Sequence, residues 1–137
     1  MDLLSGAKEF LDYIRTVAQI VIVTDSFIEF VMPFMRKLGF PICFCHNLEI
    51  DKEGMITDYK IRINEMKKKT VLALKNLNYD VIAAGDSYND VSMLLEAKHG
   101  ILFRPPKKVV EQFPELPVVN EFDELKGLIS KYLGFSN

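Results

Sequence analysis

The chain has 137 residues, 49% of them hydrophobic, which predicts one compact domain spanning residues 1–137 with a core of its own. Its formal net charge of −2 gives no electrostatic basis for binding nucleic acid or an anionic membrane surface, so neither is an expected partner. Because no apolar run is long enough to cross a bilayer and the opening residues do not resemble a signal peptide, we expect a cytoplasmic protein.

The first half of the chain alternates between helical and extended patterns. Apolar residues recur at helical spacing from Ala7 to Val17, which predicts an amphipathic opening helix. The β-branched run at 20–23 predicts a strand that is covered on both faces. The elements expected next are a helix that begins after Thr24-Asp25-Ser26, contains Pro33 and ends at about Leu38 before Gly39, a short strand at 42–44, and a β-hairpin within 48–63.

The second half continues the alternation to the end of the chain. The expected elements are a helix at 70–77, a strand at 81–84, a helix at 90–97, a strand at 100–103, a helix at 107–113, a strand at 117–119 and a closing helix at 122–132. Such a series predicts an α/β fold in which helices cover both faces of a mainly parallel sheet. Ligands bind such sheets at the carboxyl ends of the strands.

Two cysteines, Cys43 and Cys45, alternate along an expected strand and are followed by His46 on its opposite face. This C-x-C-H pattern offers zinc ligands, but the second ligand pair that a structural zinc site requires is missing from the sequence. Free cysteine is among the most frequently buried residue types. The pattern therefore favours buried thiols on a strand over a zinc site.

The segment at 81–90, Val-Ile-Ala-Ala-Gly-Asp-Ser-Tyr-Asn-Asp, is the most informative stretch of the chain. An apolar strand ends at a glycine and is followed by Asp86, and Asp90 comes four residues later on the same side of a starting helix. Carboxylate oxygens in this arrangement suit Mg²⁺, which usually completes its coordination with water and a substrate phosphate. The alternative is that Ser87, Asn89 and Asp90 only cap the helix that follows.

Thr24-Asp25-Ser26 follows the first predicted strand at the sheet edge where Gly85-Asp86 is also expected, and Lys67 precedes the helix that leads to the later strand. A threonine hydroxyl and the free N–H groups of a helix start can donate to phosphate oxygens, and a lysine adds a point charge. Each of these residues also has a simpler interpretation. Thr24 and Ser26 are common N-cap residues, and the three lysines at 67–69 are typical of a solvated helix start. An acid pair and a lysine also occur in the receiver domains of two-component signalling. Those domains need more than one acid after the first strand, whereas Thr24-Asp25-Ser26 offers only one.

These residues resemble the motifs of the haloacid dehalogenase-like phosphatases, on the branch of the phosphoserine phosphatases and homoserine phosphotransferases. The run at 21–30, Val-Ile-Val-Thr-Asp-Ser-Phe-Ile-Glu-Phe, is similar to the second motif, which implies that Thr24 binds phosphate. Lys67 occupies the place of the third-motif lysine, and Gly-Asp-Ser-Tyr-Asn-Asp at 85–90 is similar to the fourth motif. The resemblance implies that Asp86 is a direct Mg²⁺ ligand, Asp90 a supporting acid and Asn89 a neighbour of the phosphate.

The resemblance further implies a three-layer Rossmann-like fold with a small β-hairpin, a Mg²⁺ cofactor and a phosphorylated small-molecule substrate such as phosphoserine. It assigns Lys67 and Asp90 to catalysis, Asp86 and Asp90 to the metal, and phosphate binding to a set of five residues, namely Thr24, Asp25, Ser26, Lys67 and Asn89.

The first motif of that family, Asp-x-Asp-Gly-Thr, does not occur in this sequence. In the family its first aspartate attacks phosphorus to form an aspartyl-phosphate, and its second acts as general acid and base. We therefore expect this chain alone to be inactive and to lack a central strand between those that end at Thr24 and Ala84. Either these strands pair directly or a complementing N-terminal fragment or a dimer partner supplies the strand. An alternative is that Thr24-Asp25-Ser26 is a decayed first motif. The second motif is the better match, because it fits the helix and the Leu-Gly-Phe-Pro that follow.

Three hypotheses of function remain open at this stage. The chain is part of a phosphoserine phosphatase-like hydrolase that is completed in trans, or a non-catalytic module that binds phosphate and Mg²⁺, or a structural remnant whose motifs are idle. Whether this polypeptide is itself an enzyme is therefore not decided by the sequence.

Overall fold

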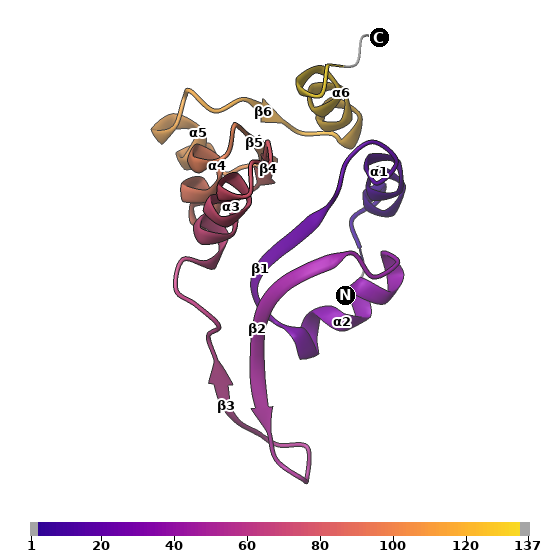
Figure 1. Ribbon diagram of the computed structural model, residues 1–137, viewed down its shortest axis with the longest axis vertical. Helices are drawn as coiled ribbons and strands as arrows, with labels where there is room; N and C mark the ends of the chain where they lie inside the picture. The colour runs from indigo at the N-terminus through magenta and orange to yellow at the C-terminus, as the bar shows by residue number, and fades with distance from the viewer. Residues whose placement is uncertain (1–2, 135–137) are drawn as a thin grey trace. The chain divides into compact units, whose positions relative to one another are not determined.

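The computed structural model describes residues 3–134. The chain divides into two compact units, Met1–Met66 and Lys67–Asn137, and each unit has a sheet and helices of its own (Figure 1). The single domain expected for residues 1–137 stays a prediction. None of the helices in the described part of the chain has the length and hydropathy that a membrane span requires.

The first unit contains a three-stranded sheet in the order β1-β2-β3, in which β1 and β2 are parallel and β2 and β3 are antiparallel. The predicted β-hairpin is therefore present. At its turn, Asp51 Oδ1 accepts hydrogen bonds from the backbone N–H groups of Glu53 and Met55, and Gly54 has a positive φ of 83°. The elements of this unit are α1 (Ala7–Ile14), β1 (Val21–Phe27), α2 (Ile28–Lys37), β2 (Ile42–Ile50) and β3 (Ile56–Lys60).

Strand β1 is longer than its sequence predicts and contains a bulge. Val23 pairs with Phe44 and Phe27 pairs with His46, so three residues of β1 lie opposite one residue of β2. The bulge consists of Thr24, Asp25 and Ser26. Bulges leave residues without ladder partners and redirect their side chains, and they are frequent next to active sites. The segment predicted to bind phosphate is thus part of an irregular strand rather than of a helix start.

Helix α2 begins at Ile28 and contains Pro33, as predicted. It ends where Gly39 takes a left-handed φ of 80°, which glycine adopts without steric cost. Nη1 of Arg15 donates a hydrogen bond of 3.0 Å to the carbonyl oxygen of Leu38, so the end of α2 is also held by the segment that follows α1.

The second unit contains an all-parallel sheet in the order β4-β5-β6, surrounded by four α-helices. Its core includes Leu94 and Leu102, whose side chains are 1% and 0% exposed. Gly100 permits the close approach of α4 to β5, because a Cβ there would lie 2.3 Å from the carbonyl oxygen of Leu94. The elements are α3 (Met66–Asn76), β4 (Ile82–Gly85), the 3₁₀ turn η1 (Tyr88–Asp90), α4 (Val91–Glu96), β5 (His99–Phe103), α5 (Lys107–Gln112), β6 (Val118–Val119) and α6 (Phe122–Tyr132).

The α/β class, the mainly parallel strand pairing and the hairpin agree with the sequence prediction. Strand β1 is an edge strand of the first sheet, and β4 is an edge strand of the second. An edge strand leaves one row of backbone N–H and C=O groups without ladder partners, and this row can pair with another strand.

Candidate active site

The loop after β4 is built around the carboxylate of Asp90. Oδ2 of Asp90 accepts hydrogen bonds from the backbone N–H groups of Asp86 (2.9 Å) and Ser87 (3.1 Å) and from the Ser87 hydroxyl (3.2 Å). Asp90 is only 6% exposed. The capping interpretation of this segment is therefore correct for Asp90, which ties the end of β4 to the turn that leads into α4.

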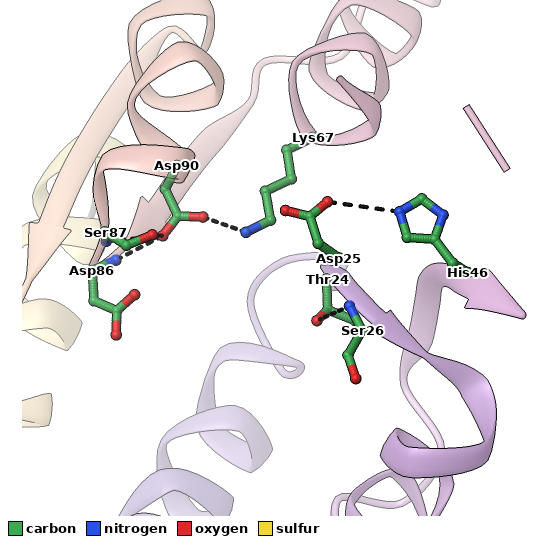
Figure 2. A network of polar contacts seen from close by, with 8 residues as sticks. All are labelled: Thr24, Asp25, Ser26, His46, Lys67, Asp86, Ser87 and Asp90. Carbon is green, nitrogen blue, oxygen red and sulfur yellow. Dashed lines mark hydrogen bonds and ion pairs between the residues drawn. The ribbon is translucent and has the colours of Figure 1, made fainter. Parts of the chain in front are cut away.

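The other oxygen of the same carboxylate binds Lys67. Nζ of Lys67, near the start of α3, lies 2.6 Å from Oδ1 of Asp90, and the two side chains are 16% and 8% exposed (Figure 2). Burial of the carboxyl group raises its pKa, but the hydrogen bond from Lys67, the N–H groups of Ser87 and Asp86 and the lysine charge together outweigh burial. The net result is an Asp90 pKa below its ordinary value, so this carboxyl group is ionised at neutral pH.

Gly85 is required at the end of β4 because Asp90 lies directly over it. A Cβ at residue 85 would lie 2.5 Å from the Cβ and 2.6 Å from the Cγ of Asp90, closer than real side chains approach. The glycine that ends the predicted apolar strand is therefore explained by the packing of the Asp90 side chain.

Asp86 differs from Asp90 in both exposure and partners. Asp86 is exposed, and its carboxylate is turned away from Asp90 (Figure 2). Within residues 3–134, no side-chain hydrogen bond or ion pair engages this carboxylate. Asn89 is also exposed. The structure thus brings Lys67, Asp86 and Asp90 together around one loop and leaves only the carboxylate of Asp86 open to solvent and to a ligand.

No group of three or more acidic, histidine or cysteine side chains able to hold a metal ion occurs in the described part of the chain. The donors on Asp90 already use both of its oxygens, whereas Asp86 offers hard oxygen atoms of the type that Mg²⁺ prefers. The assignment of both acids to a metal stays a prediction, and the geometry favours Asp86 as the ligand and Asp90 as the acid that orients Lys67.

In the first unit, the predicted phosphate-binding residues form the bulge of β1. Thr24 Oγ1 accepts a hydrogen bond of 3.1 Å from the backbone N–H of Ser26, and the two residues are half-buried. Helix α2 starts only at Ile28, and its N-cap residue is Phe27, without a side-chain cap. The alternative in which Thr24 and Ser26 are N-cap residues is therefore wrong, because pairing with β2 extends the strand past both of them.

Sequence reasoning missed the relation of His46 to this bulge. His46 is 3% exposed, and its Nε2 lies 3.7 Å from Oδ1 of Asp25 (Figure 2). The sequence drew attention to His46 only as a zinc ligand beside the two cysteines. Cys45 is buried and Cys43 half-buried, which agrees with buried strand thiols. Burial and the neighbouring Cys45 raise the Cys43 pKa to about 11.

Comparisons with known proteins agree with this architecture. Residues 2–98 match the model of the haloacid dehalogenase-like hydrolases. Over 123 residues, or 90% of the chain, the sequence is 50% identical to the phosphoserine phosphatase ThrH of Pseudomonas aeruginosa and to a phosphoserine phosphatase of Pseudomonas syringae pv. tomato. The chain covers 60% and 52% of these two relatives, so it spans little more than half of their length.

The fold is also that of a solved phosphoserine phosphatase in complex with its substrate. The TM-score is 0.72 at 24% identity, over 93% of this chain and 62% of that one. This likeness concerns the fold alone, whereas the family model and the two Pseudomonas relatives rest on sequence. The chain belongs to the haloacid dehalogenase-like hydrolase family, on its phosphoserine phosphatase branch.

Proposed function

We propose that this chain supplies the phosphate-binding and metal-binding part of a phosphoserine phosphatase-like hydrolase. The proposed reaction is hydrolysis of a phosphate monoester, or transfer of its phosphoryl group, through an aspartyl-phosphate. The nucleophilic aspartate belongs to an Asp-x-Asp-Gly-Thr strand that this sequence does not contain. The proposed substrate is a phosphorylated small molecule such as phosphoserine, the compound named in the descriptions of the relatives.

The observation that carries the proposal is the Lys67–Asp90 pair beside the exposed Asp86 carboxylate. A lysine that is 16% exposed and bonded to a buried acid is a fixed positive charge rather than a solvated surface group. Such preorganised charge stabilises the negative oxygens of a phosphoryl group during transfer. In the proposal Lys67 contacts the phosphate, and Asp90 holds the lysine in place through the hydrogen bond to Nζ.

The bulge of β1 has the second role in the proposal. The Thr24 hydroxyl accepts from the Ser26 N–H and keeps its own proton for donation to a phosphate oxygen. Asn89, exposed on the η1 turn, is proposed as a further phosphate contact.

The proposed cofactor is Mg²⁺, with Asp86 as the ligand that this chain provides. The Asp86 carboxylate fits this role because it is exposed and its oxygens are hard donors. When bound, the ion would neutralise part of the negative charge on the phosphoryl group. Asp90 is proposed to support this ligand by fixing the backbone of residue 86 through its N–H.

The missing aspartate requires a further segment of polypeptide. Strands β1 and β4 are both edge strands, and an edge can accept a strand from another chain by backbone hydrogen bonding. We propose that the aspartate-bearing strand comes from a complementing N-terminal fragment or from a second copy in a dimer. The proposal also places the protein in the cytoplasm, where free thiols such as Cys43 and Cys45 stay reduced.

A second candidate function is a non-catalytic module that binds phosphate and Mg²⁺. It is favoured by one specific observation: the proposed binding groups Thr24, Lys67 and Asp86 are all in this chain, whereas the nucleophile is not. The two candidates differ in whether a complementing segment produces turnover.

The test measures phosphate release from phosphoserine with Mg²⁺, using the 137-residue chain and its Asp86→Asn variant, with and without a polypeptide that carries an Asp-x-Asp-Gly-Thr strand and a helical cap. We expect the chain alone to be no faster than the variant. Turnover should appear on complementation and be lost again in the Asp86→Asn and Lys67→Met variants. Clear activity of the chain alone would refute the missing-nucleophile argument. Phosphate binding without turnover in any mixture would favour the non-catalytic module.

A further inference from the structure

His46 is a buried polar residue beside an aromatic ring. Its side chain is 4% exposed on β2. The ring of Phe27, the residue paired with it on β1, lies 6.3 Å away between centroids, and Phe27 itself packs edge-on against Tyr59 at 6.4 Å. A buried imidazole needs hydrogen-bond partners for both of its nitrogens, because leaving either unsatisfied costs free energy.

The first partner fixes the tautomer of the ring. Nδ1 of His46 accepts a hydrogen bond of 3.0 Å from the backbone N–H of Arg62. The Arg62 side chain strengthens this clamp, since its Nε donates to the Cys45 carbonyl (3.0 Å) and its Nη2 to Asn47 Oδ1 (3.2 Å). Because Nδ1 receives a proton donor, it carries no proton, and the single N–H of the neutral ring must be on Nε2.

The N–H at Nε2 is directed at Asp25 in the bulge of β1. The distance from Nε2 to Oδ1 of Asp25 is 3.7 Å, which is an electrostatic contact rather than a short hydrogen bond (Figure 2). The Asp25 side chain is 57% exposed, whereas that of His46 is 4% exposed, so a buried ring faces a carboxylate at the surface. A proton on Nδ1 would meet the Arg62 N–H, so Nε2 is the ring nitrogen that can donate.

We propose that His46 is a positioning residue: Arg62 locks it as the Nε2–H tautomer, and its N–H orients Asp25 and thereby the Thr24–Ser26 bulge. The bulge residues have no partner in the β1–β2 ladder, and the Thr24–Ser26 hydrogen bond is internal to the bulge. The contact with His46 links the bulge to the neighbouring strand. This inference rests on the proposed function in so far as the bulge binds phosphate.

The first experiment reads the tautomer directly. The chain has only two histidines, so a ¹⁵N-histidine-labelled sample gives two sets of imidazole signals, each with Nδ1 and Nε2, and His99 in the other unit is the internal control. We expect long-range ¹H–¹⁵N spectra at neutral pH to show His46 protonated at Nε2 alone. The Asp25→Asn variant should shift the His46 Nε2 signal and leave the His99 signals in place. A proton on Nδ1, an average of two tautomers, or no response to Asp25→Asn would overturn the inference.

The second experiment separates positioning from a purely structural role. In His46→Asn, the amide oxygen can replace Nδ1 as the acceptor for Arg62, but nothing replaces the N–H at Nε2. In His46→Gln, the amide nitrogen can replace Nε2 as the donor to Asp25, but the Arg62 N–H loses its acceptor. We expect His46→Asn to keep most of its thermal stability and to bind inorganic phosphate in the presence of Mg²⁺ about three- to tenfold more weakly. We expect the reverse pattern for His46→Gln.

Parallel loss of stability and affinity in both variants would mean that His46 has a structural role only. If the wild-type chain binds no phosphate, the proposed function of this chain fails. In that case the tautomer and the Asp25-dependent shift still decide whether His46 positions Asp25.

Discussion

The ammonium group of Lys67 lies 2.6 Å from Oδ1 of Asp90, and this ion pair connects the start of α3 to the loop after β4. The other oxygen of Asp90 accepts hydrogen bonds from the backbone N–H groups of residues 86 and 87. The carboxylate therefore joins the Lys67 side chain to the loop that carries Asp86. The same interaction therefore bears on the stability of the second unit and on the proposed chemistry.

Removing the lysine charge is expected to destabilise the protein markedly. Lys67→Met leaves the Asp90 carboxylate buried without its cationic partner, and breaking such a pair should lower the free energy of unfolding by about 2–4 kcal/mol. Lys69→Met is the matched control, since Lys69 is exposed on the same helix and should change stability by less than about 0.5 kcal/mol. Urea unfolding followed by circular dichroism measures both. Equal stability of the two variants would mean that the Lys67–Asp90 pair is not a stabilising contact.

The stabilisation from Asp90 should disappear in acid. The folded-state pKa of Asp90 is lowered, so its contribution is fully present above the unfolded-state pKa of about 4 and is lost as the pH falls through the lower folded-state pKa. We therefore expect the difference in unfolding free energy between wild type and Asp90→Asn to be constant from about pH 7 to pH 5 and to shrink below about pH 4. A difference that grows toward low pH would contradict the sign of this shift.

Two glycine substitutions should have opposite effects. Gly85→Ala places a Cβ 2.5 Å from the Cβ of Asp90 and must displace that side chain, so we expect a loss of about 2 kcal/mol or more. Gly127→Ala on α6 places its Cβ where nothing lies within 4 Å, and alanine is the better helix former, so stability should rise by up to about 1 kcal/mol. Thermal unfolding of the two variants checks both signs. A neutral Gly85→Ala would show that Asp90 is not held over the glycine.

Cys43 is expected to react slowly with alkylating reagents in the native protein. Its pKa is raised to about 11, two units above the ordinary value of 9.0, so at neutral pH it should hold roughly a hundredfold less thiolate than an ordinary cysteine. Mass spectrometry after iodoacetamide treatment at pH 8 should find Cys43 largely unmodified in the native chain and modified in urea. Rapid native labelling would indicate that the thiol is neither buried nor close to Cys45.

The periodic and locally encoded features of the fold could be predicted from sequence. The closing helix has its predicted bounds, 122–132, and the strand and helix boundaries of the second unit fall within a few residues of those expected, apart from the earlier start of α3. The family was predicted from short motifs at 21–30, 67 and 85–90, and the comparisons confirm the family. These signals depend on neighbours in the sequence or on residue identity, and neither needs knowledge of long-range contacts.

The remaining features depend on contacts that one sequence does not reveal. Thr24-Asp25-Ser26 has the residues of a helix cap, but pairing with β2 outweighs that local preference and extends β1 to Phe27. The spacing of Asp86 and Asp90 could not tell which carboxylate turns toward Lys67 and which toward solvent. The role of His46 was not predictable, because it requires residues 25, 46 and 62 to meet across two strands and the segment after β3.

The bulge of β1 has a consequence for how this segment can vary in length. It adds two residues relative to β2, so Val23 and Phe27 stay on the same face of the sheet, as their partners Phe44 and His46 do. Removing one residue here would turn Phe27, the last residue of the strand, to the opposite face, whereas removing two would restore a regular ladder. Length changes at this point are therefore compatible with the fold only in even steps, and natural variants of this segment should differ by two residues or not at all.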